Sequence, residues 1–359
     1  MSTISESVQY KQANQHGRWH TKELVPPPML LVRNKTQTTL YSVSEGEVYN
    51  NGELPGLPPR TKWCCGSSHG WLATVDELTN QGVVIALRNP FRKSSPIRLP
   101  PLKEEISEAV KHRCQNIVYR VILSADPALN PDNYMVLALY CTDDHVLALA
   151  LFNASHGRWH FIEAPSDIFD AIFYKGRVYA IGYSGEIVSV NVDNPGQAKQ
   201  LTPSIYNLAD YCVYLVESTK GDLLTIQRRR RRQPHDASIE EALFIVYKVV
   251  FNEGDGSIEK QVEVEDIGDE ALFVDDMHSI SVSTSNYPRV RRNSIYYIKD
   301  NYCLEDQNLE DRNITKHHEL RSPFLIGLFK WIVDFILSLC GLQSASNLPV
   351  FLEWHQLPL

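Results

Sequence analysis

The segment 170–192, which reads DAIFYKGRVYAIGYSGEIVSVNV, constrains the fold of this chain more than any other stretch. It holds three short runs of β-branched and aromatic residues, separated by Lys175-Gly176 and by residues 182–185. Glycine tolerates the positive φ of a tight hairpin turn, so the two glycine-containing clusters mark chain reversals. The segment therefore predicts a meander of three antiparallel strands, which must pack against similar sheets to bury its faces.

Similar meanders recur along the chain. They are centred on residues 67–90 and 211–229, and residues 117–164 contain four strand-like runs separated by turn-rich segments. Four antiparallel strands make one blade of a β-propeller. We therefore expect an all-β protein, with residues 29–359 forming a propeller of six or seven small antiparallel blades. Residues 1–28 are polar and lack a sustained period, so we expect a flexible leader there.

Composition narrows the class of protein and its partners. Among 359 residues, 43% are hydrophobic and the formal net charge is −8, which is typical of a soluble protein and argues against nucleic acid as the main partner. The 7 cysteines are scattered, and the N-terminus lacks the apolar core of a signal peptide. We expect an intracellular monomer with reduced thiols, located in the cytoplasm, the nucleus or both.

Residues 323–342 differ in composition from the rest of the chain. They are apolar, with only Lys330 and Asp334 carrying charge. Two readings stay open: a strand followed by a helix, or one amphipathic helix, because apolar residues recur there at three and four positions. The two charges make insertion into a bilayer expensive, so membrane association is not expected. Residues 348–354 form a candidate strand to close the ring.

Two motifs resemble a catalytic site and a metal site, but the residues around them favour structural roles. Gly66, Ser68 and Gly70 match the GxSxG pattern of a hydrolase, but that motif requires a following helix, whereas WLATVD predicts a strand. His156 and His160 lie four residues apart in a strand-and-turn context without further ligands for zinc. We therefore expect no catalytic residue, no metal and no cofactor.

The chain also carries five consecutive arginines, Arg228, Arg229, Arg230, Arg231 and Arg232. Adjacent guanidinium groups resist burial, so we place them in an exposed loop between strands. They are candidates for a nuclear-localisation signal or for a patch that binds an acidic partner. The alternative is a solvated loop with no targeting role.

Six motifs, in order, resemble the plant KIB-type β-propeller family, a domain found in many plant F-box proteins. They are CCGSSHGWLATVD, NPFRKSSPIRLPPL, FDAIFYKGRVYAIGYSGEIVSVNV, YLVESTKGDLLTIQR, DIGDEALFVDD and NSIYYIKD. The resemblance covers about residues 29–302. The resemblance implies a propeller that recognises protein substrates of ubiquitin ligases.

An F-box requires a helical module of ~40 residues with its own apolar period, which residues 1–28 do not show. We therefore expect a non-catalytic protein-interaction propeller without a recognisable F-box and with an unidentified protein partner. Two alternatives are a full ubiquitin-ligase adaptor with a degenerate F-box, and an enzyme that uses the propeller channel. Inward-facing Asp, Glu or His at the channel mouth would favour the enzyme.

Overall fold

The computed structural model describes most of the chain between residues 9 and 319. The described ranges are 9–13, 19–23, 29–33, 38–50, 54–59, 62–79, 82–102, 117–142, 146–204, 211–233, 236–252, 256–275, 279–299 and 303–319. The expected features at 323–342 and 348–354 lie outside these ranges. Within them, no helix has both the length and the apolar character to span a bilayer.

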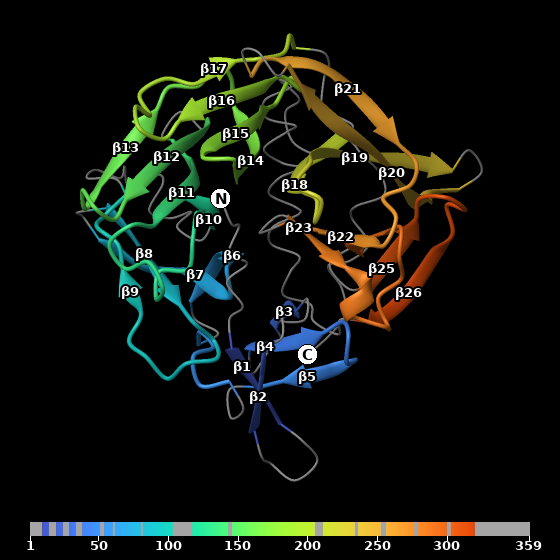
Figure 1. The fold of residues 1–359 in the computed structure, drawn as a ribbon, viewed down its shortest axis with the longest axis horizontal. Helices are drawn as coiled ribbons and strands as arrows, with labels where there is room; N and C mark the ends of the chain where they lie inside the picture. Colours follow the sequence, from blue (N-terminus) through green and yellow to red (C-terminus); the bar gives the residue numbers. More distant parts are fainter. Residues whose placement is uncertain are drawn as a thin grey trace, which may run out of the picture.

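Five sheets of four or five strands surround a common centre (Figure 1). Blade 1 contains β6 (Trp63–Ser68), β7 (Trp71–Thr79), β8 (Gly82–Arg88) and β9 (Ile97–Arg98). Blade 2 contains β10 (Val118–Leu123), β11 (Met135–Cys141), β12 (Leu147–Asn153) and β13 (Arg158–Ile162). Blade 3 contains β14 (Ile168–Tyr174), β15 (Arg177–Gly182), β16 (Ile187–Asn191) and β17 (Lys199–Gln200). Blade 4 contains β18 (Tyr211–Glu217), β19 (Leu223–Gln233), β20 (Asp236–Phe251) and β21 (Ile258–Val264).

Blade 5 departs from this pattern. Its order is β23 (Ser279–Ser283), β22 (Glu270–Val274), β24 (Ser294–Lys299), β25 (Cys303–Asn308) and β26 (Ile314–Glu319), and β22 pairs with β24 in parallel. A smaller sheet of β3 (Met29–Arg33), β4 (Thr38–Ser42) and β5 (Glu47–Tyr49) lies between blades 5 and 1 (Figure 1). In the leader, β1 (Gln9–Ala13) and β2 (Trp19–Glu23) form a two-stranded sheet.

The all-β propeller is confirmed, but the expected six or seven blades are wrong for the described residues, which contain five. Strand runs are visible in the sequence, whereas their pairing is not: five runs share blade 5, and the first runs form only a three-stranded sheet. The meander at 170–192 is confirmed as β14, β15 and β16. Its first turn contains Lys175 and Gly176, which both have positive φ, at 47° and 75°.

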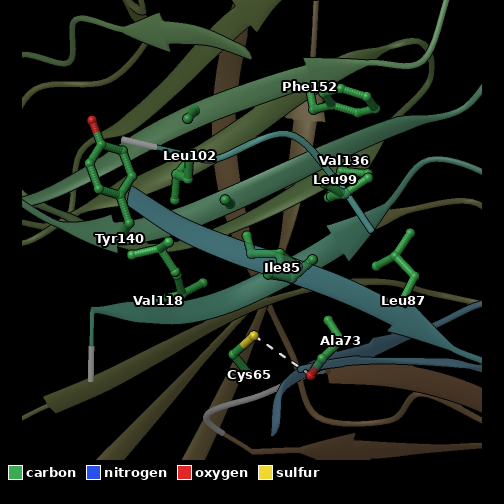
Figure 2. Packing of buried hydrophobic residues seen from close by; sticks show 14 of the residues in the cluster. Cys65, Ala73, Ile85, Leu87, Leu99, Leu102, Val118, Val136, Tyr140 and Phe152 are labelled. Atoms are coloured by element: carbon green, nitrogen blue, oxygen red, sulfur yellow. Dashed lines mark hydrogen bonds between the residues drawn. The ribbon is translucent and has the colours of Figure 1, made fainter. Parts of the chain in front are cut away.

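Apolar side chains fill the spaces between neighbouring blades. One cluster joins blades 1 and 2, with Ile85, Leu87, Val118 and Val136 fully or almost fully buried (Figure 2). The inner strands β6 and β10 approach closely at Gly66, where an added Cβ would lie 2.2 Å from the carbonyl oxygen of Val121. A glycine is therefore required there for the two blades to pack.

The ring is closed by packing between the first and last sheets. Tyr41 and Val43, at β4 and just after it, share a buried cluster with Phe273 of β22 and Tyr296 of β24. The rings of Phe273 and Tyr296 stack with centroids 4.5 Å apart. Residues more than 200 positions apart in sequence therefore meet to complete the ring.

We expect Phe273→Ala to destabilise the fold by about 3–5 kcal/mol, because it opens a cavity in the cluster that closes the ring. Urea unfolding followed by tryptophan fluorescence measures the change. Phe161→Ala is the matched control, since Phe161 is 51% exposed on the outer strand β13 and its loss removes little buried surface. Equal losses for the two variants would contradict the closing role of the cluster.

A charged cluster on Asp76 joins strands β7, β8 and β9 of blade 1 and the segment before β6. The Asp76 carboxylate, with 1% of its side chain exposed, lies 2.7 Å from Arg88, 3.3 Å from Lys62 and 3.3 Å from Arg98. Burial raises the pKa of Asp76, whereas the hydrogen bond and charge of Arg88 and the charge of Lys62 lower it. The lowering effects are larger together, so the pKa of Asp76 lies below its ordinary value of 3.8. The folded state thus favours the ionised carboxylate.

We expect Asp76→Asn to lower stability at neutral pH and to leave little difference from the wild type in acid. A depressed folded-state pKa contributes stability above the unfolded-state value, and that contribution is lost as the pH falls through the folded-state pKa. Free energies of unfolding from urea titrations between pH 7 and pH 3 measure the difference. A gap between the two proteins that stays constant over this range would contradict the assignment.

Candidate binding face

A buried ion pair lies where the inner strands of the blades converge. Asp170 of β14 is fully buried, and its Oδ1 accepts hydrogen bonds from the Nη1 of Arg120 on β10 and from its neighbour Ala171 N. Its Oδ2 accepts from Leu215 N of β18 at 2.8 Å. The Nη2 of Arg120 donates to the carbonyl oxygen of Asp275, after β22, at 2.8 Å. This pair therefore ties blades 2, 3, 4 and 5 together.

The electrostatics of this pair explain why a charge is tolerated at the centre. Burial raises the pKa of Asp170, whereas the Arg120 charge and the N–H groups of Leu215 and Ala171 act in the opposite direction. A buried carboxylate is stable only with such partners. Asp170 is a buried carboxylate at the centre of the ring, and both of its oxygens are engaged in holding blades together.

The turns that follow the inner strands form one face of the ring, which we call the hairpin face. It is made by residues 69–70, 124–134, 175–176 and 218–222. Neighbouring turns contact one another: Ser68 Oγ donates to the carbonyl oxygen of Leu123 at 3.4 Å, and Tyr174 OH donates to that of Gly221 at 2.8 Å. Loops on a rigid scaffold of this kind commonly carry binding residues.

The loop 124–134 is the longest of these turns, and Asp126 shapes it. The buried Asp126 accepts at Oδ1 from the indole N–H of Trp71, in blade 1, and from Ala128 N, both at 2.8 Å. Its main-chain oxygen accepts from Leu129 N at 3.2 Å and from Asn130 N at 3.0 Å. The loop is therefore preorganised, and Leu129 stays 51% exposed at its tip.

The turns of blades 3 and 4 place charged groups on the same face. Lys175 is exposed, and its Nζ lies 4.9 Å from the centroid of the Tyr174 ring. The hydrogen bond with Tyr174 and the charges of Asp222 and Glu217 raise the pKa of Lys175, so it is cationic at neutral pH. The hairpin face thus combines an exposed apolar residue, Leu129, with the positive charge of Lys175.

The serine and histidine motifs lie where a structural interpretation places them. Ser68 ends β6 and is buried, His69 and Gly70 form the turn with positive φ at 50° and 75°, and strand β7 follows instead of a helix. His156 lies in a turn and His160 in β13, and burial together with the charges of Arg158 and His156 lowers the pKa of His160. In the described ranges no group of three or more His, Cys, Asp or Glu residues is arranged to hold a metal.

The expected loop at Arg228, Arg229, Arg230, Arg231 and Arg232 is wrong, because all five lie in strand β19. Arg228 is half-buried, and its guanidinium carbon lies 5.1 Å from the Tyr297 ring centroid and 5.8 Å from that of Phe244. The backbone register with β20 pairs Arg231 with Glu241 and Arg232 with Glu240. Stacking on aromatic rings lets Arg228 enter a strand, which composition alone does not reveal. A targeting role stays a prediction.

Sequence reasoning missed Arg120, Asp170, Asp126 and Leu129. One signal was available for Asp170, since it is a charged residue inside the otherwise apolar run IFDAIFY. Its partner could not be found, because Arg120 lies 50 positions away. Asp126 and Leu129 belong to a turn-rich segment whose anchor, Trp71, comes from another blade.

The comparisons with known proteins agree with this architecture. The model of the KIB1-4 β-propeller matches residues 40–323. The chain belongs to the KIB1-4 β-propeller family. An F-box protein of Arabidopsis thaliana is 33% identical over 249 residues, which cover 65% of this chain and 73% of that protein. The family resemblance that the six motifs predicted is confirmed.

Among solved structures, apo AztD from Citrobacter koseri is similar with a TM-score of 0.39 and 11% identity, covering 75% of this chain and 67% of that one. A likeness this remote says nothing about the function of a KIB1-4 propeller.

We expect Arg120→Met to destabilise the protein by about 3–5 kcal/mol, because it leaves the Asp170 charge buried without its cation. Adding Asp170→Asn should recover part of that loss, since the amide keeps an acceptor oxygen and carries no charge. A double-mutant cycle from urea unfolding measures the coupling. Strictly additive losses would contradict the pairing.

Proposed function

We propose that the protein is a non-catalytic interaction propeller that binds a protein partner through its hairpin face. The observation that carries this proposal is the anchored loop 124–134, which exposes Leu129 while Asp126 and Trp71 hold its backbone. A preorganised loop loses little conformational entropy on binding, so its contacts contribute more fully to affinity. The exposed Lys175 on the same face adds a charge that can orient the partner.

The family supports a role in substrate recognition. A relative is an F-box protein, and we propose that the propeller of this chain selects the protein that a ubiquitin ligase modifies. We further propose that it acts as an intracellular monomer, in the cytoplasm, the nucleus or both. The net charge of −8 favours a protein partner over nucleic acid.

An enzyme and a full ubiquitin-ligase adaptor are the two alternative functions, and each requires a further property. For an enzyme, the central carboxylate would have to be available for chemistry, but Asp170 is fully buried and bonded to Arg120, Leu215 N and Ala171 N. For a full ligase adaptor, the chain would also have to bind a Skp1-type adaptor protein. Direct binding to such a protein separates the adaptor from a recognition module.

The test begins with affinity purification from plant cells and mass spectrometry to identify a partner, followed by calorimetry with the two purified proteins. We expect Leu129→Asp combined with Lys175→Glu to weaken binding by about tenfold or more, as for changes at central interface residues. The matched control is Val262→Asp, because Val262 is 43% exposed on the outer strand β21.

The control variant should bind as the wild type does. An unchanged affinity of the hairpin-face variant, with its thermal unfolding also unchanged, would exclude this face as the binding surface. Saturable binding of a purified Skp1-type adaptor by the wild type would instead support the full adaptor.

A further inference from the structure

The loop between β8 and β9, residues 89–96, also lies on the hairpin face. Strands β6 and β8 both pair antiparallel with β7, so they run in the same direction, and the loop after β8 emerges on the same side as the turn after β6. The loop therefore belongs to the surface that we assign to partner binding.

The start of this loop is held firmly. Asn89 is buried, its side-chain oxygen accepts from Phe91 N at 3.0 Å, and Pro90 O accepts from Gly56 N at 3.0 Å. Gly56 has no room for a side chain, since an added Cβ would lie 1.9 Å from the carbonyl oxygen of Asn89. The fixed start makes the rest of the loop project from a rigid base.

The remainder of the loop is open to solvent. Residues 93–96 have no regular secondary structure, and Arg92, Lys93, Ser94 and Ser95 are all exposed. The following strand, β9, has only two residues and is the outermost strand of blade 1 (Figure 1). An enzyme that needs an extended substrate segment could therefore bind residues 92–98 after displacing this two-residue strand and the ion pair between the exposed Arg98 and Asp76.

Ser95 has the neighbours that a particular class of kinase selects. Pro96 follows it directly, and Arg98 lies three positions after it. Proline offers no N–H, so it fits a substrate groove without an acceptor at that position, and the arginine supplies a cation for an acidic subsite. We infer that Ser95 is a phosphorylation site for a proline-directed, cyclin-dependent type of protein kinase.

The reaction is phosphoryl transfer from ATP. The Ser95 Oγ attacks the γ-phosphorus, the bond from that phosphorus to the bridging oxygen breaks, and ADP leaves. The hydroxyl proton passes to the catalytic aspartate of the kinase. The phosphate brings a charge of about −1.5 to −2 to a loop that carries Arg92 and Lys93, so it offsets the positive charge at this part of the hairpin face.

A second hydroxyl before proline shows what the site requires. Thr202 precedes Pro203, but it is half-buried and its Oγ1 accepts a hydrogen bond from Ile187 N at 2.8 Å. The third residue after Thr202 is Ile205, whereas the third residue after Ser95 is Arg98. Ser322 also precedes a proline and lies outside the described residues, with Leu325 at the corresponding position. Only Ser95 combines the proline and the arginine.

The test incubates the purified full chain with an active cyclin-dependent kinase and ATP, and follows intact mass and fragment spectra. We expect one phosphate, placed on Ser95, in the folded wild type. Ser95→Ala should remove it, whereas Ser94→Ala should leave it in place. Arg98→Ala should slow the reaction severalfold, and Arg98→Lys should restore most of the rate because it returns the cation.

Circular dichroism checks that each variant is folded. Transfer to Ser94 or Thr202 in preference to Ser95 would overturn the assignment. So would modification of Ser95 only after heat denaturation, because the folded loop would then be inaccessible to the kinase. These outcomes are independent of partner binding, so the inference and the proposed function can fail separately.

Discussion

The structure depends most on the ion pair between Arg120 and Asp170. A propeller brings its inner strands together at a narrow centre, where carbonyl and N–H groups from different blades are close but belong to no common sheet. The Asp170 carboxylate satisfies N–H groups of β14 and β18, and Arg120 extends the link to the main chain beside blade 5. Because either charge alone would be buried and unpaired, the stability of four blades is coupled through one pair.

The other contacts between neighbouring sheets combine apolar packing with a polar contact. Trp71 donates to Asp126 between blades 1 and 2, and Glu270 accepts from Thr219 N between blades 4 and 5. Arg289 donates to the carbonyl oxygen of Glu45 where the last blade meets the first sheet. These contacts lie at or near the turns, so the interactions that assemble the ring also make its surface loops rigid.

This arrangement gives a physical meaning to the motifs that carry the family resemblance. The motif CCGSSHGWLATVD supplies Gly66 for close strand packing and Trp71 for the contact between blades 1 and 2. It also supplies Asp76 for the charged cluster of blade 1. The motif that begins at Phe169 supplies Asp170. These residues position blades, so the motifs that carry the family resemblance mark the scaffold and not the exposed turns.

The sequence by itself determined the all-β class, the meander at 170–192 and the family, because strand period and turn glycines act over a few neighbouring residues. It also indicated that a strand and not a helix follows Ser68. Only the tertiary structure decided the number of blades, the pairing of Arg120 with Asp170 and the strand conformation at Arg228. Each of these depends on which distant segments become neighbours: β22 pairs with β24, Arg120 meets a carboxylate 50 positions away, and Arg228 stacks on Tyr297. Such contacts are set by closure of the ring, which no local pattern encodes.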